Sequence, residues 1–236
     1  EHFPTITNAI EEGLAFTDRF RGMPELPIHC DYHPGNLNLN RSAVLNGFIV
    51  TGGYADGNDL HRMDGVMHNM DCSPSIVNCV FTQNCATGDL SLGGAMINIS
   101  DQRSCNPFIN NCTFHQNYTA GDHSAGGAIT NMAQQLRCEP VFANCIVSGN
   151  RTNYRGGGMH NHSISGICAP IITNCVFYDN SSNECGGGLL NYCQTVIPCQ
   201  PVLTNCIFWS NSSGSCGDPL YTLCLSDEPQ VSYCNI

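Results

Sequence analysis

Two aspartates at equivalent positions are the candidate metal ligands of this sequence. Asp89 and Asp122 each follow a glycine and lie 33 residues apart. Carboxylate oxygens are hard ligands that suit Ca²⁺, and stacked loops would bring the two together. The alternative, two solvated loop residues, is favoured because no acid and base pair accompanies them. We therefore predict no metal and no other cofactor, with calcium at these two carboxylates as the single candidate.

The arginine and histidine side chains do not combine into a catalytic set. All 8 cationic residues are arginine, and Arg151 and Arg155 share one loop without a neighbouring carboxylate. His160 and His162 lie close in sequence, whereas His68 holds the position equivalent to His160 three repeats earlier. No local nucleophile signature is present, although a Ser/His/Asp or Cys/His arrangement stays open in so Ser- and Cys-rich a chain. The sequence predicts no catalytic residues and no enzyme.

The 17 cysteines are the most reactive feature of the chain. None belongs to a close Cys-x-x-Cys pair of the kind found in zinc sites, so disulfides in an oxidising compartment are the favoured interpretation. Cys185 and Cys216 are 31 residues apart, as are Cys193 and Cys224, and stacked repeats would bring each pair within disulfide reach. The odd number leaves at least one thiol unpaired or bound to another molecule.

Ten further cysteines occupy two repeat positions. In an apolar strand a cysteine acts as a small buried hydrophobe, whereas before a proline at a loop edge it could bridge neighbouring repeats. The strand column comprises Cys79, Cys112, Cys145, Cys175 and Cys206, and the loop-edge column comprises Cys72, Cys105, Cys138, Cys168 and Cys199.

These residues recur because the chain consists of successive copies of a repeat of about thirty residues. Five copies of Cys-x-Pro-x-apolar-x-Asn-Cys-x-apolar-x-x-Asn run over 72–84, 105–117, 138–150, 168–180 and 199–211, and a second block opening with paired glycines follows the first four. The apolar segments are too short for helices and are rich in β-branched residues and Phe. A strand that returns to the same lateral position must pair in parallel with its copy, about 4.8 Å away. The sequence predicts an all-β, single-stranded parallel β-helix, a solenoid of about six rungs with a partial seventh.

Stacking of identical residues explains the composition. Two apolar columns would fill the interior, and the paired glycines would permit a tight corner. An asparagine column would form a ladder at a second sharp corner, where Asn tolerates left-handed backbone and its amide can bond the Asn above and below. The predicted asparagine ladder comprises Asn84, Asn117, Asn150, Asn180 and Asn211.

The blocks resemble the right-handed parallel β-helix repeats of bacterial surface and secreted proteins, including polymorphic outer-membrane proteins with their Gly-Gly-Ala and Phe-x-x-Asn motifs. The resemblance covers 42–236 and implies a right-handed winding. It implies surface display, adhesion and assembly as often as polysaccharide chemistry.

The two ends depart from the repeat. Residues 1–41 form an N-terminal cap or edge segment, in which 3–13 suit a short capping helix similar to the one in pectate-lyase-like proteins. The alternative is that 4–10 are one more copy of the repeat. The repeats occupy 42–236 and stop within a strand block, so either the chain is truncated or another subunit completes the open rung and builds a filament.

Charge and composition exclude two classes of partner. The net charge of −11 opposes nucleic acid, and no apolar run approaches the ~20 residues of a spanning helix. The chain begins at Glu1, so a leader has been removed or the chain is a fragment. An extracellular or cell-surface location is expected. If the source glycosylates, the candidate sites are Asn40, Asn98 and Asn161.

Three functions remain for a chain with this pattern. The favoured one is an extracellular structural rod that stacks end to end with copies of itself into a fibre or surface assembly. The second is an adhesin or glycan-binding module that uses exposed aromatic residues such as Tyr118 and Tyr154. The third is a polysaccharide lyase-like enzyme, which would need Arg and carboxylates from different rungs to converge.

Overall fold

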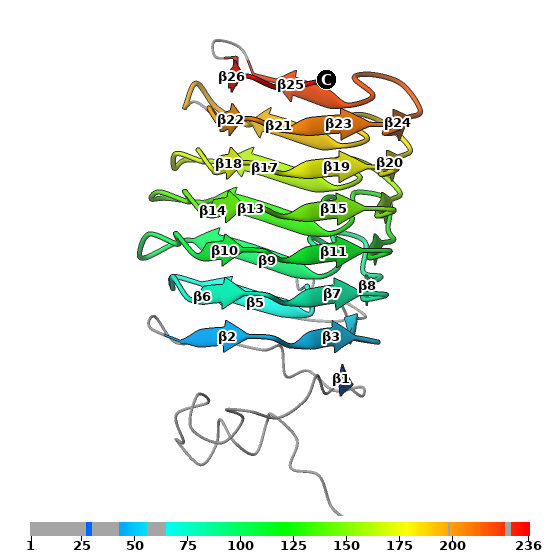
Figure 1. The fold of residues 1–236 in the computed structure, drawn as a ribbon. Helices are drawn as coiled ribbons and strands as arrows, with labels where there is room; N and C mark the ends of the chain where they lie inside the picture. The colour runs from blue at the N-terminus through cyan, green and yellow to red at the C-terminus, as the bar shows by residue number, and fades with distance from the viewer. Residues whose placement is uncertain (1–26, 30–42, 56–64, 198, 225–227) are drawn as a thin grey trace, which may run out of the picture.

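The chain is a parallel β-solenoid of about six turns (Figure 1). The computed structural model describes residues 27–29, 43–55, 65–197, 199–224 and 228–236, and within these ranges every regular element is a strand. The predicted all-β parallel solenoid is therefore confirmed. The expected helix over 3–13, the alternative repeat over 4–10 and the boundary at 41/42 lie outside the described residues.

Each rung contributes one strand to each of four sheets, in the order C, A, D, B along the chain. Sheet C contains β2 (Val44–Asn46), β6 (Ser75–Val77), β10 (Phe108–Asn110), β14 (Val141–Ala143), β18 (Ile171–Thr173), β22 (Val202–Thr204) and β26 (Gln230–Ser232). Sheet A contains β1 (Pro27–His29), β3 (Ile49–Thr51), β7 (Val80–Thr82), β11 (Thr113–His115), β15 (Ile146–Ser148), β19 (Val176–Tyr178) and β23 (Ile207–Trp209).

The two remaining sheets complete the turn. Sheet D contains the two-residue strands β4 (Tyr54–Ala55), β8 (Cys85–Ala86), β12 (Tyr118–Thr119), β16 (Arg151–Thr152), β20 (Ser181–Ser182) and β24 (Ser212–Ser213). Sheet B contains β5 (Met67–Met70), β9 (Met96–Ser100), β13 (Ile129–Ala133), β17 (Met159–Ser163), β21 (Leu189–Cys193) and β25 (Leu220–Leu223). All pairings between these strands are parallel and in register with the repeat, so equivalent residues of successive copies lie side by side.

The core is a set of apolar columns along the solenoid axis. The predicted column through Ile109 pairs it with Ile76 on one side and Phe142 on the other, and all three are buried. In the neighbouring column the rings of Phe81 and Phe114 stack with centroids 4.9 Å apart and planes 5° from parallel. Burial of each such side chain contributes about 1.5–3 kcal/mol, which makes these columns the main source of stability.

The corners use left-handed backbone at positions other than the predicted ones. The Asn between sheets C and A takes a positive φ, as at Asn111 (52°) and Asn144 (54°). At the corner after sheet A, the positive φ belongs to the residue just before the ladder asparagine, such as Gln83 (55°) or Gln116 (53°). The prediction that the ladder asparagines themselves adopt left-handed backbone is therefore wrong. Asn is required at these positions for the hydrogen bonds of its side-chain amide.

The paired glycines allow backbone to approach backbone across rungs. A Cβ on Gly127 would lie 2.2 Å from the carbonyl oxygen of Gly157 and 2.4 Å from that of Arg151. No side chain fits at this distance, so the second block needs glycine for close packing. Among the described residues, no helix is long and apolar enough to span a membrane.

Candidate functional site: the axial ladders and the Arg155 cluster

The predicted asparagine ladder forms a continuous buried chain of hydrogen bonds. In Asn150, Nδ2 donates to the Phe114 carbonyl (2.9 Å) and to Oδ1 of Asn180 (2.9 Å), and the backbone N–H donates to the same Oδ1 (3.1 Å). Its Oδ1 in turn accepts from the backbone N–H (2.9 Å) and Nδ2 (3.0 Å) of Asn117. The amide is satisfied on both sides, so the ladder ties each rung to the next without an unpaired polar atom.

A second buried ladder runs inside sheet B. Asn98 Nδ2 donates to Asn131 Oδ1 at 2.8 Å, and Asn131 Nδ2 donates to Asn161 Oδ1 at 2.8 Å. The same bond links Asn69 to Asn98 at one end and Asn161 to Asn191 at the other. The sequence signal for this ladder is the Asn that recurs at a constant place in the second block.

This second ladder corrects the glycosylation prediction at two sites. Asn98 and Asn161 are fully buried, and the Nδ2 atoms that would carry a glycan are hydrogen-bonded within the stack. A glycan on either nitrogen would displace the neighbouring rung. Asn40 lies outside the described residues.

A third ladder is exposed at the corner between sheets C and A. Nδ2 of Asn111 donates to Oδ1 of Asn78 at 2.7 Å, and Nδ2 of Asn205 donates to Oδ1 of Asn174 at 2.8 Å. Because water competes for these amides, this ladder adds less stability than the buried ones.

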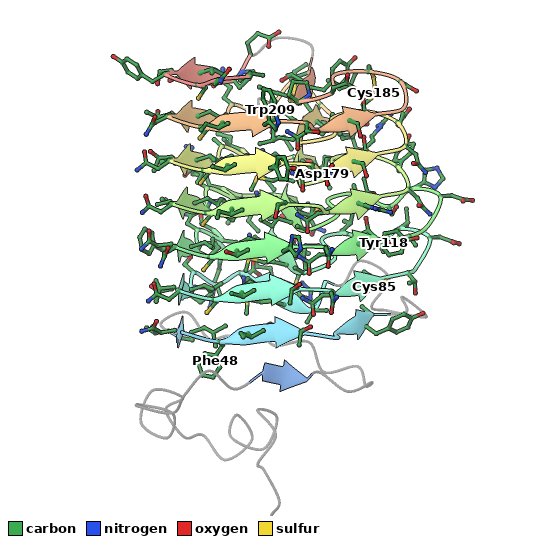
Figure 2. All side chains as sticks on the ribbon, turned by 45° about the vertical axis from the view of Figure 1, so that its right-hand side comes forward. Phe48, Cys85, Tyr118, Asp179, Cys185 and Trp209 are labelled. Atoms are coloured by element: carbon green, nitrogen blue, oxygen red, sulfur yellow. A yellow bond between two sulfur atoms is a disulfide. The ribbon has the colours of Figure 1, made fainter. Side chains whose placement is uncertain are left out.

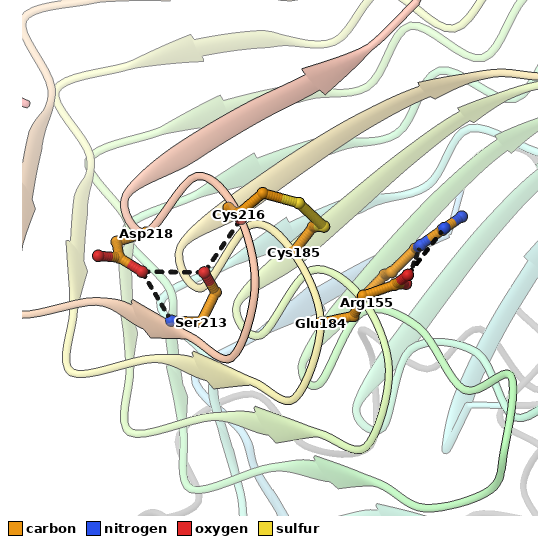
Figure 3. Close-up of a disulfide and its surroundings, with 6 residues drawn as sticks. All are labelled: Arg155, Glu184, Cys185, Ser213, Cys216 and Asp218. Atoms are coloured by element: carbon orange, nitrogen blue, oxygen red, sulfur yellow. Dashed lines mark hydrogen bonds and ion pairs between the residues drawn. A yellow bond between two sulfur atoms is a disulfide. The ribbon is translucent and has the colours of Figure 1, made fainter.

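Two disulfides join neighbouring rungs near the C-terminal end of the described residues. Cys185 bonds Cys216, and Cys193 bonds Cys224, as their spacing of 31 residues predicts. The Cα atoms are 4.6 Å and 4.8 Å apart, which is the separation of stacked strands. Figure 3 shows Cys185–Cys216 with Ser213 alongside, whose backbone N–H donates to Asp218. The disulfides therefore connect rungs that the β-ladders already hold together.

Most of the other described cysteines are packed thiols, and the bridge that was possible for the loop-edge column does not form at Cys105, Cys138 or Cys168. The strand column lies in the apolar core, as its position predicted. In the loop-edge column, Sγ of Cys105, Cys138 and Cys168 lies 3.2–3.5 Å from the backbone oxygen of the asparagine ladder in sheet B. Burial raises the pKa of the Cys138 and Cys168 thiols, so both stay protonated and unreactive.

Asp89 and Asp122 lie in exposed loops on adjacent rungs. The backbone N–H of His123 donates to the Asp89 carbonyl at 3.0 Å, which aligns the two loops. Within the part of the chain that the structure describes, no group of three or more His, Cys, Asp or Glu side chains could hold a metal ion. The two carboxylates thus have no third His, Cys, Asp or Glu ligand in the described part of the chain.

A cluster that the sequence did not indicate surrounds Arg155. Its guanidinium donates from Nε and Nη2 to the two carboxylate oxygens of Glu184, which lies on the next rung (Figure 3). Its Cζ also lies 4.4 Å from the ring centroid of Tyr154 and 5.6 Å from that of Tyr192. The expectation that Arg155 lacks a neighbouring carboxylate is wrong, because the partner is close through stacking and 29 residues away in sequence.

Two histidines of β17 lie against the same cluster. The rings of His160 and His162 have centroids 5.4 Å apart, and Tyr192 lies 4.8 Å from His162. Burial, together with His162 and Arg155, lowers the pKa of His160 well below its ordinary range, and neither of its ring nitrogens has a hydrogen-bond partner. Burial and Arg155 also lower the pKa of His162 to about 4. Both rings are neutral at pH 7. The face of the Arg155 guanidinium already contacts tyrosine rings, and its N–H groups already bind Glu184. The cluster is therefore suited to packing neighbouring rungs together.

The fold and the ladders define the class of this protein: a parallel β-solenoid whose polar side chains bond chiefly from rung to rung. No protein-family model, no curated protein and no solved structure matches the chain.

Proposed function

We propose that this chain is an extracellular structural rod that assembles with copies of itself into a fibre or surface structure. The observation that supports this most strongly is that four parallel sheets and three asparagine ladders follow one axis through successive rungs. Bonds of this kind resist both bending and separation of rungs, because each rung is held at several points around its circumference.

The proposal includes a right-handed winding and a relationship to the repeats of bacterial surface and secreted proteins. Support comes from the sequence motifs Gly-Gly-Ala at 93–95 and 126–128 and Phe-x-x-Asn at 81–84 and 114–117. The two disulfides favour an oxidising compartment and hence an extracellular or cell-surface location.

Self-assembly in this proposal occurs by addition of a rung to the strands β24, β25 and β26. Each of these three strands is the last of its sheet in the chain described, whereas the outer side of β23 is bridged by Asn235, whose carbonyl accepts from the backbone N–H of Phe208. Val231, in β26, continues the interior column above Leu203 and is partly exposed. Backbone donors and acceptors of a similar edge could pair there, and an assembly of this kind grows without closing.

Electron microscopy of the purified chain tests this proposal. We expect rods longer than one molecule, and we expect Val231→Asp to shorten them because it places a charge at the end of an apolar column. Val196→Asp is the control, since Val196 is 79% exposed in a loop. Dispersed monomers of the unmodified chain would refute end-to-end stacking.

Glycan binding is the second candidate, and one pair of aromatic residues favours it. Tyr178 and Trp209 are paired on adjacent rungs of sheet A, and both are exposed. Figure 2 shows Trp209 on the outer surface. Trp209 is 64% exposed, and rings of this kind stack on sugars. Glycan binding that Trp209→Ala abolishes would favour an adhesin, whereas turnover of uronate polymers would favour a lyase-like enzyme.

A further inference from the structure

Sheets C and A together form a broad outer face without charge. The outward positions of their strands from β2 and β3 onwards contain Val, Ile, Phe, Tyr, Trp, Ala, Thr, Ser, Asn, Gln and one His, and none contains Asp, Glu, Lys or Arg. The corner between the two sheets is the exposed asparagine ladder, which is also neutral. We call this surface the C–A face.

The C–A face carries rows of partly exposed apolar side chains. Phe108 and Ile171 lie on sheet C, and Ile146 and Ile207 lie on sheet A, each between 43% and 46% exposed. Tyr178 and Trp209 extend the row on sheet A. Contiguous apolar surface of this extent on a folded chain typically marks an interaction site.

Among the residues that the structure describes, the charged side chains lie outside the C–A face. The described acidic residues are in turns and loops, such as Asp89, Asp122 and Glu184, or at the border of the face, such as Glu139 and Asp179. With a net charge of −11, two copies repel one another wherever these surfaces meet. The C–A face is the broad surface on which two copies can approach without opposing like charges.

The shape and size of the face suit a second copy. Figure 1 shows the strands of sheets C and A beside one another, with the arrows of successive rungs keeping one direction. Six rungs at about 4.8 Å and eight residues at about 3.3 Å give a face of roughly 760 Å². Two such faces would bury roughly 1,500 Å², which is within the range of specific protein interfaces. Sheet faces also pack on one another about 10 Å apart with their side chains interdigitating.

We propose that the C–A face binds the C–A face of a second copy and forms a closed dimer with twofold symmetry. Each copy contributes the same surface, so Ile146 and Ile171 become buried in both. This contact is lateral and does not depend on end-to-end stacking, because it uses side chains on the outer face and leaves the strand edges of the terminal rungs unoccupied.

Sedimentation velocity of the full chain over a range of concentrations tests the proposal. We expect a dimer, and we expect the double variant Ile146→Glu/Ile171→Glu to weaken its Kd by at least about tenfold, because four carboxylates would enter the interface. The control Leu136→Glu changes a residue that is 44% exposed and outside the face. It should leave the dimer intact. Because the substituted residues are exposed, circular dichroism should show both variants folded; if the double variant is not, Trp209→Asp provides the same test.

Three outcomes would overturn the proposal. One is a chain that remains monomeric up to about 100 µM, where even a weak specific interface would be populated. Another is a dimer that the double variant leaves unchanged. The third is a monomer that cosediments with an insoluble polysaccharide through this face, which would assign the face to a glycan. Loss of the dimer with retention of long rods, or the reverse, separates this inference from end-to-end stacking.

Discussion

At the scale of the residue, stability depends on whether a polar side chain is satisfied within the stack. Asn150 makes its bonds in a site closed to water, whereas Asn144 bonds Asn110 and sits at an exposed corner. A buried donor or acceptor that loses its partner costs about 1–3 kcal/mol, whereas an exposed one can turn to water. An asparagine amide therefore contributes more to stability in the buried ladder than in the exposed one.

Substitution of Asn150 by Ala should lower the free energy of unfolding by roughly 3–5 kcal/mol, because it leaves the Phe114 carbonyl and the Asn117 amide unpaired in the interior. Urea denaturation followed by circular dichroism measures the change. Asn144→Gly is the control and should change stability by less than about 1 kcal/mol, since glycine accepts the positive φ at this corner. Equal losses in the two variants would contradict the ladder argument.

The buried histidines predict sensitivity to acid. The pKa of His162 is lowered from 6.5 to about 4 by burial, so the unfolded chain binds a proton before the folded one as the pH falls. Stability should be complete above pH 6.5 and decline between pH 6.5 and 4, by up to roughly 3 kcal/mol from this residue. Urea denaturation at a series of pH values measures this decline.

The variant His162→Met should make the decline smaller without abolishing it, because one buried histidine is removed and His160 remains. A methionine already occupies the neighbouring position of the same column at Met132. Met132→Leu, which removes no titratable group, should shift stability equally at every pH. If His162→Met retains the full dependence, the acid sensitivity originates elsewhere.

At the scale of the element, the disulfides act on strands that are already paired. Cys193 is the last residue of β21, and Cys224 directly follows β25. The bond between them closes a loop of 31 residues. Restriction of the unfolded chain by such a loop contributes roughly 3–4 kcal/mol. The gain falls on the C-terminal rungs, whose strand β26 is exposed at all three residues.

Replacement of Cys193 and Cys224 by Ala should therefore lower the free energy of unfolding by roughly 3–4 kcal/mol and leave the fold intact. Denaturation of the variant and of the parent, each with and without reductant, measures the effect. Reductant should destabilise the parent more than the variant. Unchanged stability of the double variant would show that the sheet ladders alone hold these rungs.

At the scale of the whole molecule, the solenoid is a one-dimensional array in which each rung contacts its neighbours. In sheet B all five residues of β13, in a middle rung, are buried, whereas the residues of β25 and those of β26 in sheet C are partly or fully exposed. Local opening should therefore be easiest at the C-terminal end of the described residues.

Amide hydrogen exchange measured by mass spectrometry should follow this gradient. We expect the slowest exchange in peptides covering β13 to β17 and exchange at least about tenfold faster in those covering β26, because opening a middle rung breaks bonds on both sides. Uniform protection along the chain would instead show that the solenoid opens as a single unit.

The sequence by itself determined the solenoid, its rung length, its apolar columns and the partners of both disulfides. The reason is geometric: parallel strands in register translate each residue onto its copy, so a constant spacing such as that of Cys185 and Cys216 becomes a contact. Residues that recur with the repeat could therefore be placed by counting.

Only the tertiary structure decided the contacts of residues that do not recur, and the backbone conformation and burial of some that do. The ion pair of Arg155 and Glu184 joins residues without equivalents in the other rungs, and the left-handed backbone falls on Gln83 because side-chain bonds hold Asn84 in the stack. Burial also mattered. The glycosylation sequons at Asn98 and Asn161 are inaccessible because both asparagine side chains are buried in the ladder of sheet B. Spacing specifies which residues are neighbours, but the direction and burial of each side chain depend on how the whole turn closes around the core.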